Sequence, residues 1–353
     1  MNIEDFNFDL PESLVGQKAI EPRDSCRLLV LDKDKGGVSH HVFSDLKNIL
    51  DENCVLVLND TKVFPARLFG KKETGGQVEL LLLKQTGQST FSAIGKGLPK
   101  KGSLLTFGRE LTGTVEEKHE DGEVEINFNY SGPELLEKID QLGSTPLPPY
   151  IHSKEKEPLL REQYQTVYAR ERGSSAAPTA GLHFTDKLLA DLLNRGVMIE
   201  KVTLHVGLGT FRPVTTEQIR DKVLHSESFF LSQETAQRLN LAKKAGKKII
   251  AVGTTACRLL ETLSNEQGMI SPGAGETNIF IQPGYKFKFV DGLITNFHLP
   301  KTSLLMLVSA LVSAPNSPTA FKNFSDSPIG KAYREAIKKE YKFFSFGDAM
   351  LIL

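Results

Sequence analysis

The sequence has few cysteines and no surplus of charge of either sign. Its 353 residues include only Cys26, Cys54 and Cys257, which form no CxxC pair. This spacing gives no support for a thiolate metal site and fits a reducing compartment. Lysine plus arginine equals aspartate plus glutamate, 43 against 43, so the formal net charge is zero. The balance argues against a protein that coats nucleic acid by bulk charge, although it leaves room for a local basic patch.

Long apolar runs are also missing. The first fourteen residues, MNIEDFNFDLPESL, are acidic and contain no apolar signal core. The longest apolar run, residues 304–314, contains two serines and is too short to span a bilayer. We therefore expect a cytoplasmic protein that does not associate with membranes.

The chain is longer than one hydrophobic core usually serves, which favours two domains. Between residues 70 and 130, short apolar runs recur about every ten residues with glycine, aspartate and lysine turns between them, as in a small barrel or sandwich. Strands alternate with helices on both sides of this segment, which is typical of an α/β domain. We predict an α/β domain formed by residues 1–69 and 151–353, with an all-β, barrel-like domain inserted at 70–150.

Polar residues follow the predicted buried strands of the α/β domain. The apolar run 54–58 leads into Asn59 and Thr61, the run 248–252 into Thr254 and Thr255, and the run 293–295 into Asn296. Ligand groups of α/β proteins tend to lie at such strand ends. A solvated turn is the alternative interpretation.

The stretch 173–214 contains two turns rich in glycine and threonine, each with one histidine, His183 and His205. A helix at 186–194, capped by Thr185, and a strand at 197–206 separate the turns. Glycine allows close approach of the backbone to a ligand, and histidine changes charge near neutral pH. Two walls of one site are one interpretation; ordinary core histidines beside turns are the other.

Four of the eight histidines lie in the second half of the chain, and most of these follow a strand or a glycine turn: His183, His205, His225 and His298. None are spaced as HxH or HExxH, which disfavours a metal site. The alternative is an acid/base site without metal, formed by the histidines together with Glu227.

Several segments carry a resemblance to a known family. They are 58–68 (LNDTKVFPARL), 146–151 (PLPPYI), 164–169 (YQTVYA), 176–185 (AAPTAGLHFT), 204–214 (LHVGLGTFRPV), 252–255 (VGTT), 293–300 (LITNFHLP) and 343–350 (FFSFGDAM). In these segments, and in their order, the sequence resembles the QueA family, the S-adenosylmethionine:tRNA ribosyltransferase-isomerases of queuosine biosynthesis. The resemblance covers nearly the whole chain.

The resemblance implies an activity and its partners. The ribosyl part of S-adenosylmethionine would be transferred and isomerised onto 7-aminomethyl-7-deazaguanine (preQ1) at the wobble position of tRNA, giving epoxyqueuosine with release of adenine and methionine. The donor would be consumed, so no cofactor and no metal are implied. We expect a monomer that binds tRNA through its anticodon loop.

The resemblance also suggests roles for the candidate residues. Catalytic acid/base roles would fall to His183, His205, His225, Glu227 and His298. Substrate hydrogen bonds would come from Asn59, Thr61, Thr179, Thr210, Thr254, Thr255 and Asn296. Arg67, Arg212 or Arg258 would pair with the methionine carboxylate. Phe184 or Phe211 would stack on a base, with core packing as the alternative.

The tRNA would need a basic face. Candidates are Lys71, Lys72, Lys96, Lys100, Lys101, the lysines at 243–248 and the predicted helix 331–342. Two other functions compete with this one. A tRNA-binding homologue without catalysis is the first, and a methyltransferase that uses the same donor is the second.

Overall fold

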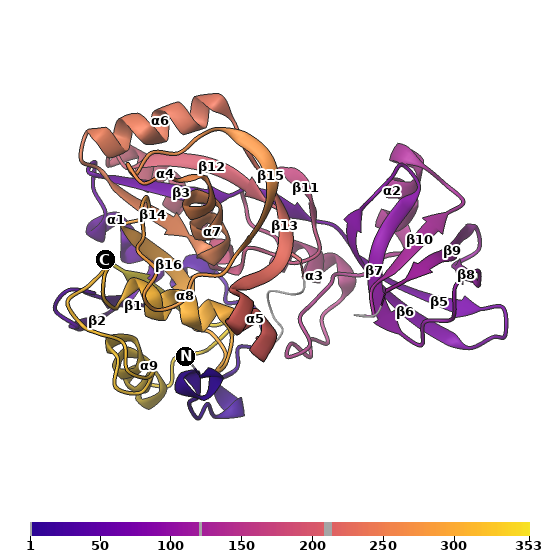
Figure 1. The fold of residues 1–353 in the computed structure, drawn as a ribbon, viewed down its shortest axis with the longest axis horizontal. Coiled ribbons are helices and arrows are strands. Elements are labelled where there is room, and N and C mark those ends of the chain that lie inside the picture. The colour runs from indigo at the N-terminus through magenta and orange to yellow at the C-terminus, as the bar shows by residue number, and fades with distance from the viewer. Residues whose placement is uncertain (1, 120–121, 208–213) are drawn as a thin grey trace.

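The computed structural model describes residues 2–119, 122–207 and 214–353. A nine-stranded sheet forms the centre of the larger domain (Figure 1). Its order is β15 (Gly273–Ile279), β13 (Val223–Leu231), β12 (Met198–Leu204), β3 (Cys54–Asn59), β14 (Lys248–Val252), β16 (Gly292–Asn296), β17 (Ala349–Ile352), β1 (Arg27–Leu31) and β2 (Val38–Val42). The four strands β12, β3, β14 and β16 run parallel. All six residues of β3 are buried, as the unbroken apolar run predicts.

Alternate residues of β3 enter two separate cores, because successive side chains of a strand point to opposite faces of the sheet. Val55 and Val57 join a core that includes residues of four helices: α6 (Gln233–Lys244), α7 (Gly253–Leu263), α8 (Ser303–Leu311) and α9 (Pro328–Lys338). Leu56 and Leu58 join a core that includes residues of α1 (Leu46–Ile49) and α4 (Asp186–Asn194). Helices therefore cover both faces, which confirms the predicted α/β class.

The smaller domain is a closed six-stranded antiparallel barrel, seen on the right of Figure 1. Its strands are, in order, β10 (Val124–Phe128), β7 (Thr90–Lys96), β6 (Gln77–Gln85), β5 (Arg67–Lys72), β8 (Leu104–Phe107) and β9 (Leu111–Lys118). The helix α2 (Gly132–Leu142) packs on the barrel core through Leu135 and Ile139. The all-β insert is confirmed as a barrel, while the boundaries at 69/70 and 150/151 stay a prediction.

Several short elements lie outside the nine-stranded sheet and the barrel. They are β4 (Thr61–Val63), which pairs with β11 (Glu171–Ser174), the helices α3 (Glu157–Gln163) and α5 (Thr216–Asp221), and the 3₁₀ turn η5 (Thr179–His183). No helix in the described parts of the chain is long and apolar enough to cross a membrane.

Some local predictions were wrong. The last helix begins at Pro328 and ends at Lys338, since Ser327 caps it and proline is favoured in a first turn. His225 does not follow a strand, because it lies inside β13, where the pairing with β15 shifts register between Val223 and Glu227.

Candidate functional site

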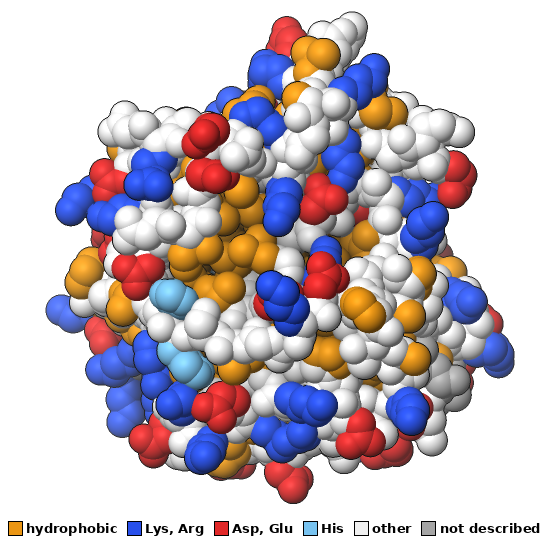
Figure 2. Space-filling model, turned by 90° about the vertical axis from the view of Figure 1, so that its left-hand side faces the viewer, with side chains coloured by type: hydrophobic (Ala, Val, Ile, Leu, Met, Phe, Trp, Pro, Cys, Tyr) orange, Lys and Arg blue, Asp and Glu red, His pale blue; other side chains and the backbone are white. Residues whose placement is uncertain are grey.

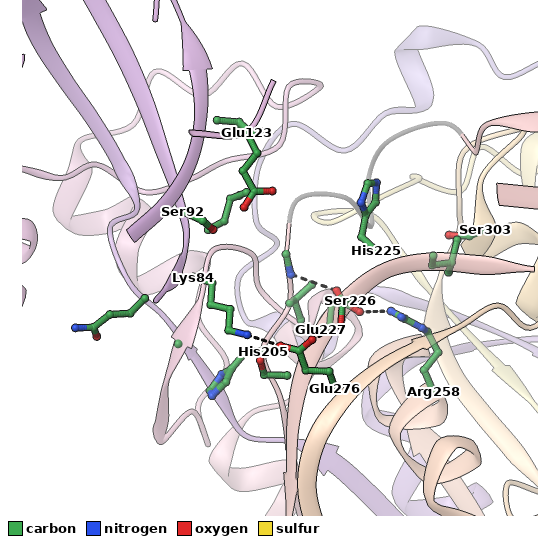
Figure 3. A pocket seen from close by; sticks show the side chains of 18 of the residues that line it. Lys84, Ser92, Glu123, His205, His225, Ser226, Glu227, Arg258, Glu276 and Ser303 are labelled. Atoms are coloured by element: carbon green, nitrogen blue, oxygen red, sulfur yellow. Dashed lines mark hydrogen bonds and ion pairs between the residues drawn. The ribbon is translucent and has the colours of Figure 1, made fainter. Parts of the chain in front are cut away.

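The main cavity lies between the barrel and the sheet and has a volume of about 570 Å³. In Figure 3 the labelled side chains approach it from both domains, with Ser92 and Glu123 on the barrel side and Ser303 and Arg258 on the other. We call this cavity the interdomain pocket. It is lined by residues 83–85, 92, 94, 123, 172, 173, 205–207, 214, 218, 224–228, 258, 276 and 303.

A buried ion pair forms one wall of the interdomain pocket. The Glu227 carboxylate on β13 accepts a hydrogen bond from Nη1 of Arg258 on α7, and both side chains are 4% exposed. Glu227 also accepts the Gly207 N–H at 3.2 Å. The Nε and Nη2 groups of Arg258 have no acceptor within the described residues. Because a buried guanidinium N–H without a partner is costly, a carboxylate that reached these groups would satisfy them.

The two predicted histidines that line the pocket differ in exposure. His205 follows β12 and is half-buried, and its Nδ1 lies 2.8 Å from the hydroxyl of Thr61. Burial lowers the pKa of His205, and the nearby carboxylates of Glu171 and Asp60 oppose this only in part. His225 is exposed on β13, and in Figure 3 its ring points into the gap between the domains. His225 is therefore the more accessible of the two.

His183 lies outside this pocket in a buried network. Its Nε2 is 2.9 Å from the Asn296 amide nitrogen, and its Nδ1 is 3.2 Å from the Cys26 sulfur. Asn296 also donates to the Phe344 carbonyl and accepts from Thr179 at 3.0 Å. Burial lowers the pKa of His183 to about 4. With both ring nitrogens engaged, His183 is placed to orient Asn296 and Thr179.

His298 is buried on the same side of the sheet as α9. Its Nε2 lies 2.8 Å from the Thr295 hydroxyl, and its backbone N–H donates to the hydroxyl of Tyr333. Burial lowers the pKa of His298 to about 3. Together with Thr179 and Asn296 it borders a small cavity of about 30 Å³, too small for a nucleoside in this conformation.

The predicted amide and hydroxyl groups at the ends of β3 and β14 mostly bond to the protein itself. Asn59 donates to the Leu204 carbonyl at 2.9 Å and accepts the Leu204 N–H at 3.0 Å, which ties β3 to β12. Asn59 also donates to the hydroxyl of Thr255 at 3.2 Å. Thr254 and Thr255 are buried at the start of α7, and neither is among the residues that line the pocket.

Two further predicted residues, Arg67 and Phe184, do not line the interdomain pocket. Arg67 pairs with Glu79 of the barrel at 2.7 Å and donates to the Leu147 carbonyl. Phe184 is fully buried, with its ring edge-on to Phe43, which fits the core-packing interpretation. Thr210, Phe211 and Arg212 lie outside the described residues, so their predicted roles stay predictions.

The predicted basic residues do not form one patch. Lys243 is paired with Asp291, whereas Lys71, Lys96, Lys100 and Lys101 are exposed on the barrel. Figure 2 shows the face of the main domain that is remote from the barrel. There, basic side chains are interspersed with acidic ones around a central apolar hollow.

The comparisons with known proteins agree with the resemblance. The family model described as "Queuosine biosynthesis protein" matches residues 3–352.

The chain belongs to this family.

Curated relatives are similar over their full length. A protein named S-adenosylmethionine:tRNA ribosyltransferase-isomerase from Clostridioides difficile (strain 630) is 49% identical over 357 residues, with 100% of each chain covered. A protein of the same name from Staphylococcus haemolyticus is 48% identical, again over 100% of both chains. The crystal structure of S-adenosylmethionine tRNA ribosyltransferase from Thermotoga maritima is 32% identical, covers 99% of this chain and 100% of its own, and has a TM-score of 0.55.

Sequence reasoning about this queuosine-family chain missed several pocket residues. Lys84 of the barrel pairs with Glu276 of β15, which also accepts the Ser226 hydroxyl at 2.7 Å. The strand that carries Glu276 lacks a buried run, so it gave no signal as part of the sheet. Arg172, in contrast, directly precedes the stretch 173–214 and was within reach of the sequence argument.

Proposed function

We propose that the chain transfers and isomerises the ribosyl moiety of S-adenosylmethionine onto preQ1 in the anticodon loop of tRNA, with adenine and methionine as leaving products. The observation that carries this proposal is the interdomain pocket, lined by His205, His225, Glu227 and Arg258, in a chain whose full-length relatives bear the name of that enzyme. The donor is a substrate that is consumed, so the reaction needs no resident cofactor.

The size and the walls of the pocket suit this donor. A volume of about 570 Å³ falls within the range of sites that hold nucleoside-sized ligands. The unpartnered N–H groups of Arg258 would take the methionine carboxylate, since arginine can bind a carboxylate through two hydrogen bonds. Of the other predicted arginines, Arg67 pairs with Glu79 of the barrel and is not among the residues that line the pocket.

The chemistry needs a base and a group that assists the departure of adenine. The base removes an acidic proton beside the sulfonium. The aminomethyl nitrogen then forms a bond to one ribosyl carbon and loses a proton, and adenine leaves with the electron pair of its glycosidic bond and takes up a proton. A ribose hydroxyl loses its proton and closes the epoxide, as the carbon–sulfur bond breaks and methionine leaves with that electron pair. Because His225 is exposed in the pocket, it is the histidine best placed to be the base. His183 and His298, neutral and hydrogen-bonded, would act through the groups they hold.

The tRNA would approach from the side where the two domains meet. The anticodon loop can present splayed bases to a pocket of this kind, since single-stranded loops are read by stacking and by hydrogen bonds. The exposed lysines of the barrel, among them Lys71 and Lys96, would contact phosphates. Charge reversal at these lysines should weaken tRNA binding and reduce its dependence on salt.

One experiment separates the candidate functions. The protein is mixed with S-adenosylmethionine and preQ1-bearing tRNA, and the small products are identified by mass spectrometry. Release of adenine and methionine supports the proposal. S-Adenosylhomocysteine would instead indicate methyl transfer, and tRNA binding without any product would indicate the non-catalytic homologue; either result contradicts the proposal.

A matched pair of variants tests the carboxylate-binding role of Arg258. Arg258→Gln should weaken binding of S-adenosylmethionine more than binding of the decarboxylated donor. Arg238→Gln is the control, because Arg238 is also paired with a carboxylate, Glu200, but lies outside the interdomain pocket. Equal loss of both donors in Arg258→Gln would remove Arg258 from this role.

A further inference from the structure

A chain of hydrogen bonds runs from the backbone to the ring of His205. The Val206 N–H donates to the Ser174 hydroxyl at 2.7 Å. That hydroxyl lies 2.8 Å from the hydroxyl of Thr61, which in turn lies 2.8 Å from Nδ1 of His205. Ser174 and Thr61 are both fully buried, on the paired strands β11 and β4. Water therefore does not compete for the hydroxyls of Ser174 and Thr61, and the backbone N–H of Val206 fixes the direction of the first bond.

The direction is set at the backbone end. An amide N–H can only donate, so the Ser174 oxygen accepts from Val206. The Ser174 hydroxyl proton then goes to Thr61, its other hydrogen-bond partner within the described residues. The Thr61 hydroxyl can then donate its own proton to one of two acceptors. These are Nδ1 of His205 at 2.8 Å and the Glu171 carbonyl oxygen at 3.4 Å. If Thr61 donates along the shorter contact, Nδ1 of His205 is the acceptor; if it donates to the Glu171 carbonyl, Nδ1 donates to Thr61. We take the first arrangement, because the 2.8 Å contact is the shorter of the two.

An accepting Nδ1 places the proton of the neutral ring on Nε2. No hydrogen bond to this nitrogen occurs within the described ranges, and the ring lines the interdomain pocket. Gly173 packs against the ring: a Cβ at this position would lie only 2.6 Å from Cε1 and from Nδ1. The ring is thus held on one side by Gly173 and at Nδ1 by Thr61. Burial, which lowers the pKa of His205, keeps the ring neutral near pH 7.

We propose that Ser174 and Thr61 are positioning residues that hold His205 in the tautomer protonated at Nε2, and that this N–H stabilises the departing adenine. The inference rests on the proposed function. As the glycosidic bond breaks, its electron pair moves to adenine, and the Nε2–H donates a hydrogen bond to the purine nitrogen where negative charge develops. The neutral ring keeps its proton, and adenine takes up its own from another group. His205 is thereby assigned to adenine departure and not to the base role.

Replacing His205 by two different amides tests this assignment. The glutamine nitrogen can reach the position of Nε2, whereas the shorter asparagine side chain reaches only that of Nδ1. We expect His205→Asn to lower kcat for adenine release by about 10²–10³-fold, the usual cost of one donor to developing charge, with little change in KM. His205→Gln should retain at least about tenfold more activity than His205→Asn. Equal activity of the two folded variants would overturn the proposal.

Substitutions at Thr61 test the positioning role. Thr61→Ser keeps the hydroxyl and should stay close to the wild type in kcat. Thr61→Val keeps the shape without the hydroxyl and should lower kcat about tenfold at constant KM, as expected when one hydrogen bond is lost. If both variants have the same kcat and the same thermal midpoint, Thr61 is not a positioning residue.

The protonation of the His205 ring can be measured in the free protein without any reaction, so this test does not depend on the proposed function. Nitrogen-15 chemical shifts of labelled histidine distinguish a protonated from an unprotonated ring nitrogen, and His205→Gln identifies the signals. We expect a protonated Nε2 and an unprotonated Nδ1 in the free protein at about pH 7.5, where a histidine of lowered pKa is neutral. A protonated Nδ1 would refute the proposed tautomer even if the enzyme releases adenine. Absence of adenine release by the wild type would instead refute the proposed function.

Discussion

Acidification should destabilise the folded chain through His183 and His298. Burial lowers their pKa values to about 4 and about 3, below the value of about 6.5 in an unfolded chain. The stability that each neutral ring contributes is therefore fully present above pH 6.5 and is lost as the pH falls towards the folded pKa. At about pH 5 the unfolded histidines are mostly protonated while the buried ones stay neutral, which corresponds to roughly 2 kcal/mol for each residue.

Urea unfolding at about pH 7.5 and about pH 5 measures this loss. His298→Gln removes the titrating ring but can still hydrogen-bond to Thr295. The pH-dependent loss of unfolding free energy should shrink by roughly 2 kcal/mol in this variant. The control is His152→Gln, because His152 is exposed and should leave the pH dependence unchanged. If His298→Gln loses as much stability on acidification as the wild type, the ring is not held neutral by burial.

Three other substitutions have defined outcomes. Arg258→Ala removes the guanidinium that pairs with the buried Glu227 carboxylate, and it should lower the unfolding free energy in urea by about 3–5 kcal/mol. The double variant Glu227→Leu/Arg258→Met should recover most of that loss, and equal stability of the two variants would contradict the buried pair. Gly173→Ala places a Cβ 2.6 Å from the His205 ring and should lower adenine release by at least about tenfold, with little change in the thermal midpoint; unchanged release would mean that the ring can move. Phe184→Ala removes a fully buried ring and should lower the free energy of unfolding by about 3–5 kcal/mol, with an unchanged KM for S-adenosylmethionine. A raised KM would favour the stacking role.

Much of the local structure follows from short-range features of the sequence. The threonine at 185 caps α4 by accepting the Leu188 N–H at 3.1 Å, and the helix runs over the predicted residues. The apolar run of β3 is buried on both faces. By contrast, β15 reads GAGETNI and becomes a strand because it pairs with β13. No periodicity within the segment marks that pairing.

The candidate site shows the same contrast between what local sequence predicts and what the packing of distant segments decides. Residue types and strand ends singled out His205 and Glu227, the family resemblance added Arg258 as one of three arginines, and the interdomain pocket brings these three together. The same features singled out His183 and Phe184 equally, although both are buried outside this pocket. A glycine turn or a strand end looks alike whether it opens to a cavity or to the core. Only the packing of the surrounding elements distinguishes the two.

The sequence by itself determined the two kinds of domain, the family and the chemical inventory of the site, because periodicity, turn residues and motifs are properties of adjacent residues. The tertiary structure decided which of those residues meet. The Lys84–Glu276 pair joins positions 192 residues apart, and the contacts of Thr61 with Ser174 and His205 span 113 and 144 residues. Such distances are closed only when the barrel and the sheet have formed, so the groups that face the pocket, and the proton each one carries, are set by the fold.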